Sequence, residues 1–435
     1  MNRGDYLRQH IESIDGPLGE TPKHVKMTTS PFVFYRGTAQ LFYADMASGV
    51  LRMPKAMEAL PLVCVMGDCH ASNFGFLTEE GSHGDNVIFA PNDFDDACVG
   101  HAAWDIMRFL VSLALTADHC EGVQSGRYPS DVVRHDKPAI ARRDVEIAMA
   151  QFLEAYTALC ARVIQSPSVI YEAIEQIPTG KLKKRYEKAC RRAACGEDFT
   201  SKSALAKAVK MKGDRLCFNH QPDKFIPLDA SHYQQLETTF APYMDEAIVD
   251  IVARANAGTG SVNMGRYYFL VGPAYPHDET SFARCHIVEV KQQRKAAPLH
   301  YFPGLCPVNS LNAAHLTARC QRKIQRRPDL LLDEVEWRDA HWLIRSRHHA
   351  KVGIDPEDIG IGNKAVNGSF SEFASYCGKA LALAHCRADR RSTVFEQQTV
   401  AKLCEHNQTL QETALAYYRQ VLADYQLFRD MQQHN

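Results

Sequence analysis

The 435-residue sequence lacks any excess of charge of one sign. Its 50 basic and 51 acidic residues give a formal net charge of −1. Proteins that bind nucleic acid or anionic membrane surfaces through their overall field usually carry a marked basic surplus. We therefore expect neither nucleic acid nor a membrane as a partner. No internal repeat or low-complexity segment is apparent either.

Long hydrophobic runs and paired cysteines are also missing. No run approaches the roughly 20 residues of a membrane span, and the N-terminal residues are polar. The fourteen cysteines include no Cys-x-x-Cys pair and are scattered on apolar stretches, as at Cys160. This distribution suits reduced core thiols better than disulfides or a zinc site. A cytoplasmic location is the resulting expectation.

The most informative stretch runs from Val63 to Phe76. Its apolar start stops at Gly67 and gives way to small and polar residues, which predicts a strand that opens into a rigid loop. Asp68 and Asn73 then stand five positions apart. That spacing is typical of a phosphotransferase catalytic loop, in which the Asp takes the acceptor's proton and the Asn holds Mg²⁺. Asp93 would be the second magnesium ligand.

Catalysis of phosphoryl transfer depends mainly on how the protein positions charged groups around the phosphate. Mg²⁺ keeps several waters and is usually held by one or two carboxylates together with phosphate oxygens. One base, one amide ligand and one nearby carboxylate are therefore sufficient. Each residue alone has an ordinary alternative, because Asp, Asn and Gly are common turn formers.

The order of the motifs resembles the aminoglycoside phosphotransferase branch of the protein-kinase-like fold. The matching segments are 66–73, Asn92 to Asp95, and Asp105 at the head of an apolar helix. The resemblance implies that Asp68 is the base, that Asn73, Asp93 and Asp95 are metal ligands, and that His70 and Asp105 support the loop. Met66 replaces the first His of the family motif, a residue that braces the loop.

A closer resemblance, over most of the chain, is to the bacterial family called domain of unknown function 2252, which is grouped with the kinase-like folds. It rests on Arg36-Gly37, Gly67 to Gly75, Asn92 to Asp95, Gly258 to Gly265, Lys291, and Leu381 to His385. Arg36 is a candidate phosphate ligand, because a guanidinium fork suits phosphate oxygens. The alternative is a pair with a surface carboxylate. His385 would touch the cleft, or else be a core histidine bonded to a carbonyl.

The second informative stretch predicts a phosphate-binding turn between two strands. Strands at 248–253 and 266–271 flank a turn in which Gly258, Gly260, Ser261 and Gly265 would let backbone N–H groups approach phosphates. The following strand, 285–291, alternates, with Val288 and Val290 on one face and Glu289 and Lys291 on the other. Lys291 would neutralise the phosphates of ATP. Its alternative role is that of a solvent-facing strand end.

Kinases place the glycine turn and Lys before the catalytic loop, whereas this chain places them after it. We therefore expect an α+β, kinase-like bilobal fold that is circularly permuted, with a small antiparallel sheet lobe and a larger helical lobe. The expected parts are a loosely attached polar lead-in (1–30), the catalytic-loop and metal-site segment (31–165), a helical insertion (166–245), the nucleotide-binding sheet lobe (246–350) and C-terminal helices on the helical lobe (351–435). A short strand or turn is expected at 31–37.

The sequence departs from the kinase pattern in the charge partner of Lys291. The predicted helix from Asn312 to Gln325 contains no Glu, only Gln321 among cationic neighbours. The Lys–Glu ion pair of active kinases is therefore not visible. Glu289 or another carboxylate would have to replace it.

The sequence favours an ATP- and Mg²⁺-dependent phosphotransferase acting on an unidentified acceptor. Met66 and the missing Glu favour the alternative of a pseudokinase that binds nucleotide without transfer, and nucleotidyl transfer in the same cleft also remains open. A less favoured interpretation takes Asp68 and His70 as the Asp-x-His pair of a metallophosphoesterase, with Cys217 to His220 as its incomplete second motif.

Overall fold

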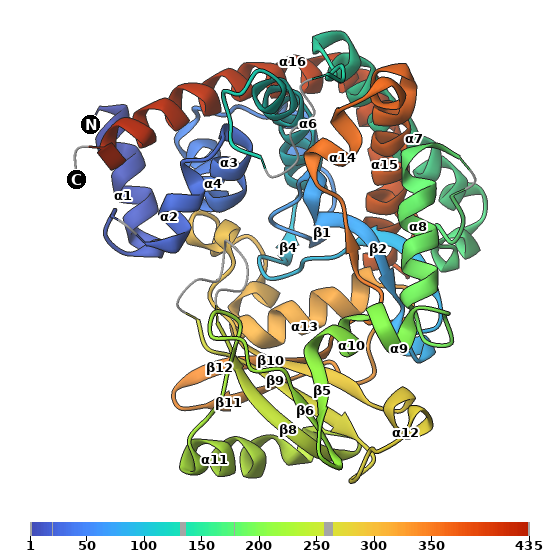
Figure 1. Cartoon of the computed structure of the whole chain (residues 1–435). Helices are drawn as coiled ribbons and strands as arrows, with labels where there is room; N and C mark the ends of the chain where they lie inside the picture. Colours follow the sequence, from blue (N-terminus) through green and yellow to red (C-terminus); the bar gives the residue numbers. More distant parts are fainter. Residues whose placement is uncertain (1, 20, 131–135, 178, 256–263, 434–435) are drawn as a thin grey trace.

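The computed structural model describes residues 2–19, 21–130, 136–177, 179–255 and 264–433. In Figure 1, a mostly helical part of the chain stands above an antiparallel sheet, so the fold class is mixed α+β. Helix α13 (Ala313–Ile324) lies between the two parts.

The main sheet has six strands in the order β11, β12, β10, β9, β8, β7, and neighbouring strands are antiparallel. The strands are β7 (Phe225–Ile226), β8 (Ala247–Arg254), β9 (Arg266–Gly272), β10 (His286–Gln292), β11 (Asp333–Trp337) and β12 (Ala340–Ser346). The strands predicted at 248–253, 266–271 and 285–291 are present as β8, β9 and β10.

Apolar and charged residues alternate along β10, so the strand has a core face and a polar face, as the sequence predicted. Val288 and Val290 pack with Phe240 of α11 (Ala230–Phe240). On the opposite face, Glu289 is paired in register with Arg345, and Lys291 with Arg266. Since side chains two apart share a face, these four charged residues stand together on the side that α13 covers.

Two short antiparallel elements carry the loops of the helical part. Strand β1 (Val63–Val65) pairs with β4 (Cys98–Gly100), and β2 (Phe74–Thr78) lies between β3 (Val87–Pro91) and β13 (Val352–Gly353). The segment 66–73 therefore connects β1 to β2, with a single 3-10 turn just before β2. The segment 92–97 connects β3 to β4. The strand and loop predicted from Val63 onward are confirmed.

Four long helices form the core of the helical part. They are α6 (Ala102–Gln124), α7 (Arg142–Gln165), α15 (Phe370–Ala388) and α16 (Val394–Gln433). Helix α7 packs against α15 and α16, and residues such as Phe152 and Cys160 are fully buried. In the described chain α7 is the one helix long and apolar enough to cross a membrane, which corrects the expectation that no run approaches a span. Half of its most apolar window is buried inside the protein. The cytoplasmic location stays a prediction.

The N-terminal region is not the loose lead-in that we expected. It forms α1 (Arg3–Asp15) and α2 (Pro22–Met27), and Leu7, Ile11 and Met27 are fully buried. Arg3 forms ion pairs with Asp45 and Asp424, which attach α1 to two other helices. Polar composition hid this packing because a helix needs only one apolar stripe to dock.

The stretch 31–37 is a helix, α3 (Pro31–Gly37), and not a strand or turn. Ser30 caps it by accepting a hydrogen bond from the backbone of Val33, and Pro31 occupies the first helical turn. These are two standard signals for a helix start, and they outweigh the β-propensity of the aromatic residues that follow. The other short helices are α4 (Ala39–Ser48), α5 (Lys55–Glu58), α12 (Glu279–Ala283) and α14 (Pro356–Gly360).

The expected helical insertion is wrong in part, because it contains strands. Its helices are α8 (Gly180–Arg192), α9 (Phe199–Lys202), α10 (Ala204–Ala208) and α11. Between them, β5 (Val209–Lys212) and β6 (Arg215–Phe218) form a hairpin. Gly213 makes the two-residue turn possible because it adopts a positive φ of 61°. Phe218 and Leu216 of β6 pack on Tyr268 and Leu270 of the main sheet.

Candidate functional site

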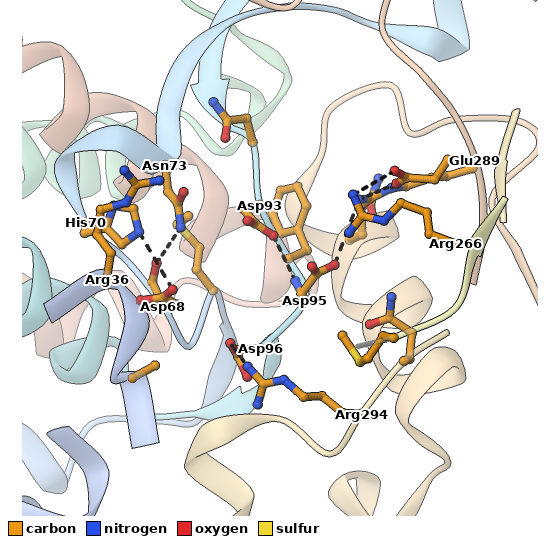
Figure 2. A pocket seen from close by; sticks show the side chains of 18 of the residues that line it. Arg36, Asp68, His70, Asn73, Asp93, Asp95, Asp96, Arg266, Glu289 and Arg294 are labelled. Carbon is orange, nitrogen blue, oxygen red and sulfur yellow. Dashed lines mark hydrogen bonds and ion pairs between the residues drawn. The ribbon is translucent and has the colours of Figure 1, made fainter. Parts of the chain in front are cut away.

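A cavity of about 350 Å³ lies where the sheet meets the helical part. Residues from both parts line it, and Figure 2 shows their side chains from close by. The helical part contributes Arg36, Gln40, Asp68, His70, Asn73, Asn92, Asp93, Asp95, Asp96 and Lys351, and the sheet part contributes Arg266, Glu289, Arg294, Gln321, Arg345 and Arg347. The two informative stretches of the sequence therefore share one cavity.

Asp105 holds the loop that follows β1. Its carboxylate accepts hydrogen bonds from the backbone N–H groups of Met66 at 2.7 Å and Gly67 at 3.1 Å. His385 Nε2 lies 3.1 Å from the same carboxylate, and its Nδ1 lies 2.6 Å from the hydroxyl of Tyr156. Asp105 and His385 are both fully buried, so they support the loop from behind and do not line the cavity.

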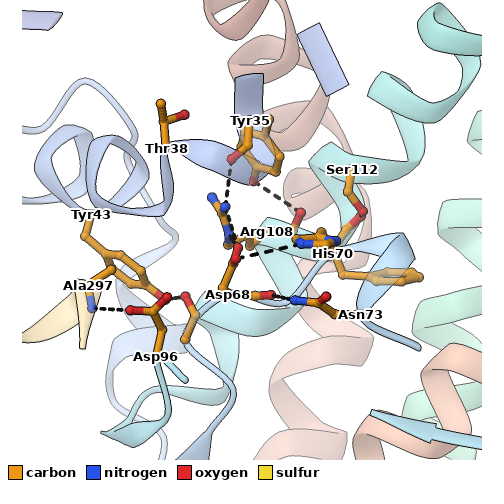
Figure 3. A network of polar contacts seen from close by, with 12 residues as sticks. Tyr35, Thr38, Tyr43, Asp68, His70, Asn73, Asp96, Arg108, Ser112 and Ala297 are labelled. Carbon is orange, nitrogen blue, oxygen red and sulfur yellow. Dashed lines mark hydrogen bonds and ion pairs between the residues drawn. The ribbon is translucent and has the colours of Figure 1, made fainter. Parts of the chain in front are cut away.

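Gly67 is required by the shape of this loop. Its φ is +75°, and a Cβ placed on it would lie 1.9 Å from the carbonyl oxygen of Asp96. The hydroxyl of Tyr43 donates to the Gly67 carbonyl at 2.6 Å (Figure 3). The loop carrying Asp68 and the segment carrying Asp96 thus touch backbone to backbone.

The Asp68 carboxylate reaches the cavity next to His70 and Asn73 (Figure 3). The Nε and Nη2 atoms of Arg108 lie 2.7 and 2.6 Å from Oδ1 of Asp68. The other oxygen, Oδ2, lies 3.7 Å from His70 Nε2. The side-chain amide of Asn73 donates to the Asp68 carbonyl at 2.8 Å, which leaves its own oxygen as the acceptor atom.

Arg108 contacts the site, and the sequence motifs did not predict it. It is fully buried on α6, donates to the Tyr35 carbonyl at 2.9 Å, and lies 4.2 Å from the centre of the Tyr35 ring. Burial alone would lower the pKa of Arg108, but Asp68 and its neighbours raise it above its ordinary value. The signal was present, since one arginine inside the apolar run from Ile106 to Leu115 needs a buried partner.

Asp95 and Lys291 join the helical part to the sheet. Asp95 lines the cavity and forms an ion pair with Lys291, whose side chain is almost fully buried beside it. Arg345 Nη2 lies 3.9 Å from the other oxygen of Asp95. Burial would raise the pKa of Asp95, but the charges of Lys291 and Arg345 bring it below its ordinary value. Burial and the neighbouring Asp95 charge raise the pKa of Asp93.

Glu289 is not the hydrogen-bonding partner of Lys291, which corrects the first substitute that the sequence suggested. Its carboxylate receives Arg345 Nη2 at 2.8 Å and lies 3.3 Å from Arg266. Helix α13 contributes Gln321 to the cavity, and the side-chain oxygen of that residue is buried without a hydrogen-bond partner. The carboxylate that meets Lys291 therefore comes from the segment after β3 and not from a helix.

The glycine turn is only partly described. Gly258, Gly260 and Ser261 lie outside the described residues. Gly265 donates its backbone N–H to the side chain of Gln292 at 3.1 Å, and a Cβ there would lie 2.4 Å from the Trp342 ring. The N–H of Gly265 is therefore used in a hydrogen bond to β10 next to the start of β9, while the neighbouring Met264 lines the cavity.

Arg36 differs from the other cavity arginines. It lines the cavity on the Asp68 side, and no residue in the described ranges forms a hydrogen bond or ion pair with it. The alternative of a surface carboxylate partner is thus not observed there. Burial lowers the pKa of the Arg36 guanidinium.

Two observations bear on metal chemistry. Within the described ranges, no group of three or more His, Cys, Asp or Glu side chains is arranged to hold a metal ion. Asn73, Asp93 and Asp95 line the cavity and offer one amide and two carboxylates, which are the hard oxygen donors that Mg²⁺ takes beside phosphate oxygens. His220, the second motif of the phosphoesterase interpretation, is exposed after β6 and does not line the cavity.

Comparison with known families identifies one match. The model of a family described as an uncharacterized protein conserved in bacteria, DUF2252, matches residues 21–431. The chain belongs to the DUF2252 family. No curated protein and no solved structure matches it.

The DUF2252 match contains every cavity residue described above, from Arg36 to Lys351. The resemblance that the sequence motifs indicated is therefore confirmed at the level of the family. The description of the DUF2252 family names no activity.

Proposed function

We propose that this protein is an ATP- and Mg²⁺-dependent phosphotransferase with a circularly permuted, kinase-like bilobal arrangement. The observation that carries the proposal is the ion pair between Lys291 of the sheet and Asp95 of the helical part. It lies at the wall of the same cavity that Asp68, Asn73 and Asp93 line. In a kinase, the strand lysine and the metal-binding Asp segment meet around the nucleotide in a comparable way.

The charges of the cavity fit a magnesium nucleotide. Lys291, Arg345 and Arg266 provide positive charge on the sheet side, where the phosphates would lie. Asn73, Asp93 and Asp95 would hold Mg²⁺ through oxygen atoms. When bound, Mg²⁺ would neutralise charge on the phosphate oxygens.

Asp68 is the proposed base for the acceptor hydroxyl. Both guanidinium contacts from Arg108 go to Oδ1, so Oδ2 is the atom left to accept a proton. Arg108 fixes the carboxylate in position, and Asp105 fixes the loop on which it stands. A positioned base of this kind typically contributes about 10²–10⁴-fold to the rate.

A second candidate is a pseudokinase that binds nucleotide without transferring phosphate. Two observations favour it, namely Met66 in place of the family His and Gln321 in place of a helix Glu near the cavity. Nucleotidyl transfer in the same cavity would use the same phosphate and metal ligands. The phosphoesterase interpretation loses support because His220 is exposed away from Asp68.

The test measures Mg²⁺-dependent ADP release from ATP, and mass changes in candidate acceptors, for wild type, Asp68→Asn and Asp93→Asn. Asp85→Asn, on an exposed residue outside the cavity, is the matched control. We expect turnover in wild type and control, and a loss of about 100-fold or more in both site variants. Transfer of AMP in place of phosphate would identify a nucleotidyl transferase. Calorimetric nucleotide binding without any product would favour the pseudokinase, and wild-type turnover in both variants would contradict the proposal.

A further inference from the structure

Arg36 and Gln40 form an unsatisfied polar wall on one side of the cavity. Arg36 lies in the last turn of α3 and Gln40 in the first turn of α4, and both line the cavity. Gln40 is 1% exposed, and its side-chain nitrogen has no hydrogen-bond partner. The Nε atom of Arg36 is also buried without a partner. Buried donors left in this condition cost free energy unless a ligand satisfies them.

Other arginines that line the cavity form ion pairs with carboxylates, whereas Arg36 does not. Arg294 is paired with Asp96, and Arg345 with Glu289. The charges of Asp68, Asp355 and Asp93 act on Arg36, but none of the three makes an ion pair with it. Asp68 is instead bonded to Arg108. Positive charge at Arg36 is therefore not compensated by a contacting side chain of the described chain.

A second cation lies close to Arg36. Burial first, and then the charge of Arg36, lowers the pKa of Lys26 on α2. Lys26 is exposed, does not line the cavity and is also acted on by the opposite charge of Asp355, so Arg36 is the cation of the two that faces the cavity. A guanidinium without an ion-pair partner, next to an unpaired buried amide donor, is an arrangement suited to an oxyanion.

The position of this wall distinguishes it from the proposed phosphate side. Figure 2 shows Arg36 beside His70 and Asp68, while Asp95, Arg266 and Glu289 lie across the cavity. Lys291 belongs to that far side through its bond to Asp95. An anion at Arg36 would therefore sit next to the proposed base and opposite the cations assigned to ATP.

We propose that the acceptor is a hydroxyl compound carrying an oxyanion, a phosphate ester or a carboxylate, and that Arg36 and Gln40 bind this group. The inference rests on the proposed function. With the oxyanion held at Arg36, the hydroxyl oxygen bonds to the γ-phosphorus while the bond from that phosphorus to the β,γ-bridging oxygen breaks. ADP leaves with the electron pair, and the hydroxyl proton goes to Oδ2 of Asp68.

The experiment measures anion binding with the nucleotide side already filled. Wild type, Arg36→Gln and Arg36→Lys are saturated with Mg²⁺ and a non-hydrolysable ATP analogue, then titrated calorimetrically with inorganic phosphate and, separately, with acetate. Arg142→Gln is the matched control, because this exposed arginine lies on α7 outside the cavity. Thermal unfolding of each variant checks that it is folded.

We expect wild type and Arg142→Gln to bind an anion, with affinity lower by roughly tenfold or more in Arg36→Gln and partly retained in Arg36→Lys. Analogue affinity should change less than about twofold across the set. Stronger binding of phosphate indicates a phosphate-ester acceptor, and stronger binding of acetate a carboxylate. Gln40→Leu should also weaken anion binding.

Three outcomes would overturn the inference, and they separate it from the proposed function. Equal anion binding by wild type and Arg36→Gln, with the analogue bound, removes the role of Arg36 and leaves the phosphotransferase proposal intact. A parallel loss of analogue affinity in Arg36→Gln makes Arg36 a nucleotide ligand and removes the acceptor assignment. Failure of wild type to bind the analogue removes the proposed function together with this inference.

Discussion

Lys291 of β10 and Asp95 of the segment after β3 form an ion pair across 196 positions of sequence. The Lys291 side chain is 1% exposed and the Asp95 side chain 23% exposed, so each charge depends on the other more than on water. The pair ties the sheet to the helical part at the wall of the cavity. Its removal should therefore be measurable in stability as well as in nucleotide binding.

Lys291→Met should lower the free energy of unfolding by about 2 kcal/mol, because it leaves the Asp95 charge poorly solvated. The cost stays below the ~3–5 kcal/mol of a fully buried pair, since Arg345 lies 3.9 Å from Asp95 and part of Asp95 is exposed. The double variant Lys291→Met with Asp95→Asn should recover at least half of the loss. Urea unfolding measures these values.

Lys402→Met is the control for this comparison, because Lys402 forms an exposed pair with Glu405 on α16. It should change stability by less than about 0.5 kcal/mol. A double variant no more stable than Lys291→Met would show that the two charges do not depend on each other.

Gly67→Ala should destabilise the protein by about 3 kcal/mol or more, because the new Cβ meets the Asp96 carbonyl and φ is positive. Gly16→Ala, which has a φ of +82° and no atom within 4 Å of the added Cβ, should cost about 1–2 kcal/mol. Gly304→Ala has neither problem and should stay within about 0.5 kcal/mol of wild type. Thermal unfolding of the three variants checks this order, and similar losses at Gly67 and Gly16 would contradict the close contact.

Asp105→Asn should reduce the free energy of unfolding by about 2–4 kcal/mol. The amide offers one oxygen where the carboxylate accepts from Met66, Gly67 and His385, so one buried N–H loses its acceptor. Chemical unfolding measures the change, and Asp85→Asn on an exposed residue should be neutral. Asp105→Asn should also slow any phosphate transfer, since it loosens the loop that carries Asp68. Unchanged stability would show that Asp105 does not hold this loop.

His70 predicts a pH dependence of stability. Burial first, and then the charges of Arg36 and Arg108, lower the pKa of His70 well below 6.5, so the folded protein keeps it neutral. The unfolded chain takes up a proton below pH 6.5, which means that stability is fully present above that pH and is lost as the pH falls toward the folded-state pKa. Between pH 7.5 and 5.5, His70→Gln should lose about 1 kcal/mol less than wild type. Parallel stability curves of the two proteins would contradict a neutral, buried His70.

Local pattern predicted the strands and long helices well. The apolar run before Gly67 and the alternation of β10 each reflect which faces of a strand are buried, and the structure has both strands. The errors fell where local signals compete. Aromatic residues at 31–37 suggested a strand, but the Ser30 cap and Pro31 start a helix.

The site residues came from motif spacing, whereas their partners did not. Asp68, Asn73 and Asp93 were selected as candidates because their spacing matches that of a phosphotransferase catalytic loop and metal site. Arg108 was not predicted, and Glu289 was suggested as the charge partner of Lys291. Motif spacing contains no information about ion pairs between distant segments. The Asp95–Lys291 contact depends on how the sheet docks on the helical part.

By itself, the sequence determined most strands and the long helices, the membership in the DUF2252 family and which residues are candidates for binding phosphate or magnesium, because periodicity and residue chemistry are local properties. Only the tertiary structure decided that Asp95 neutralises Lys291, that Arg108 neutralises Asp68, and that Arg36 has no hydrogen-bond or ion-pair partner in the described chain. The physical reason is that charge compensation in a low-dielectric interior depends on distances between segments far apart in the chain.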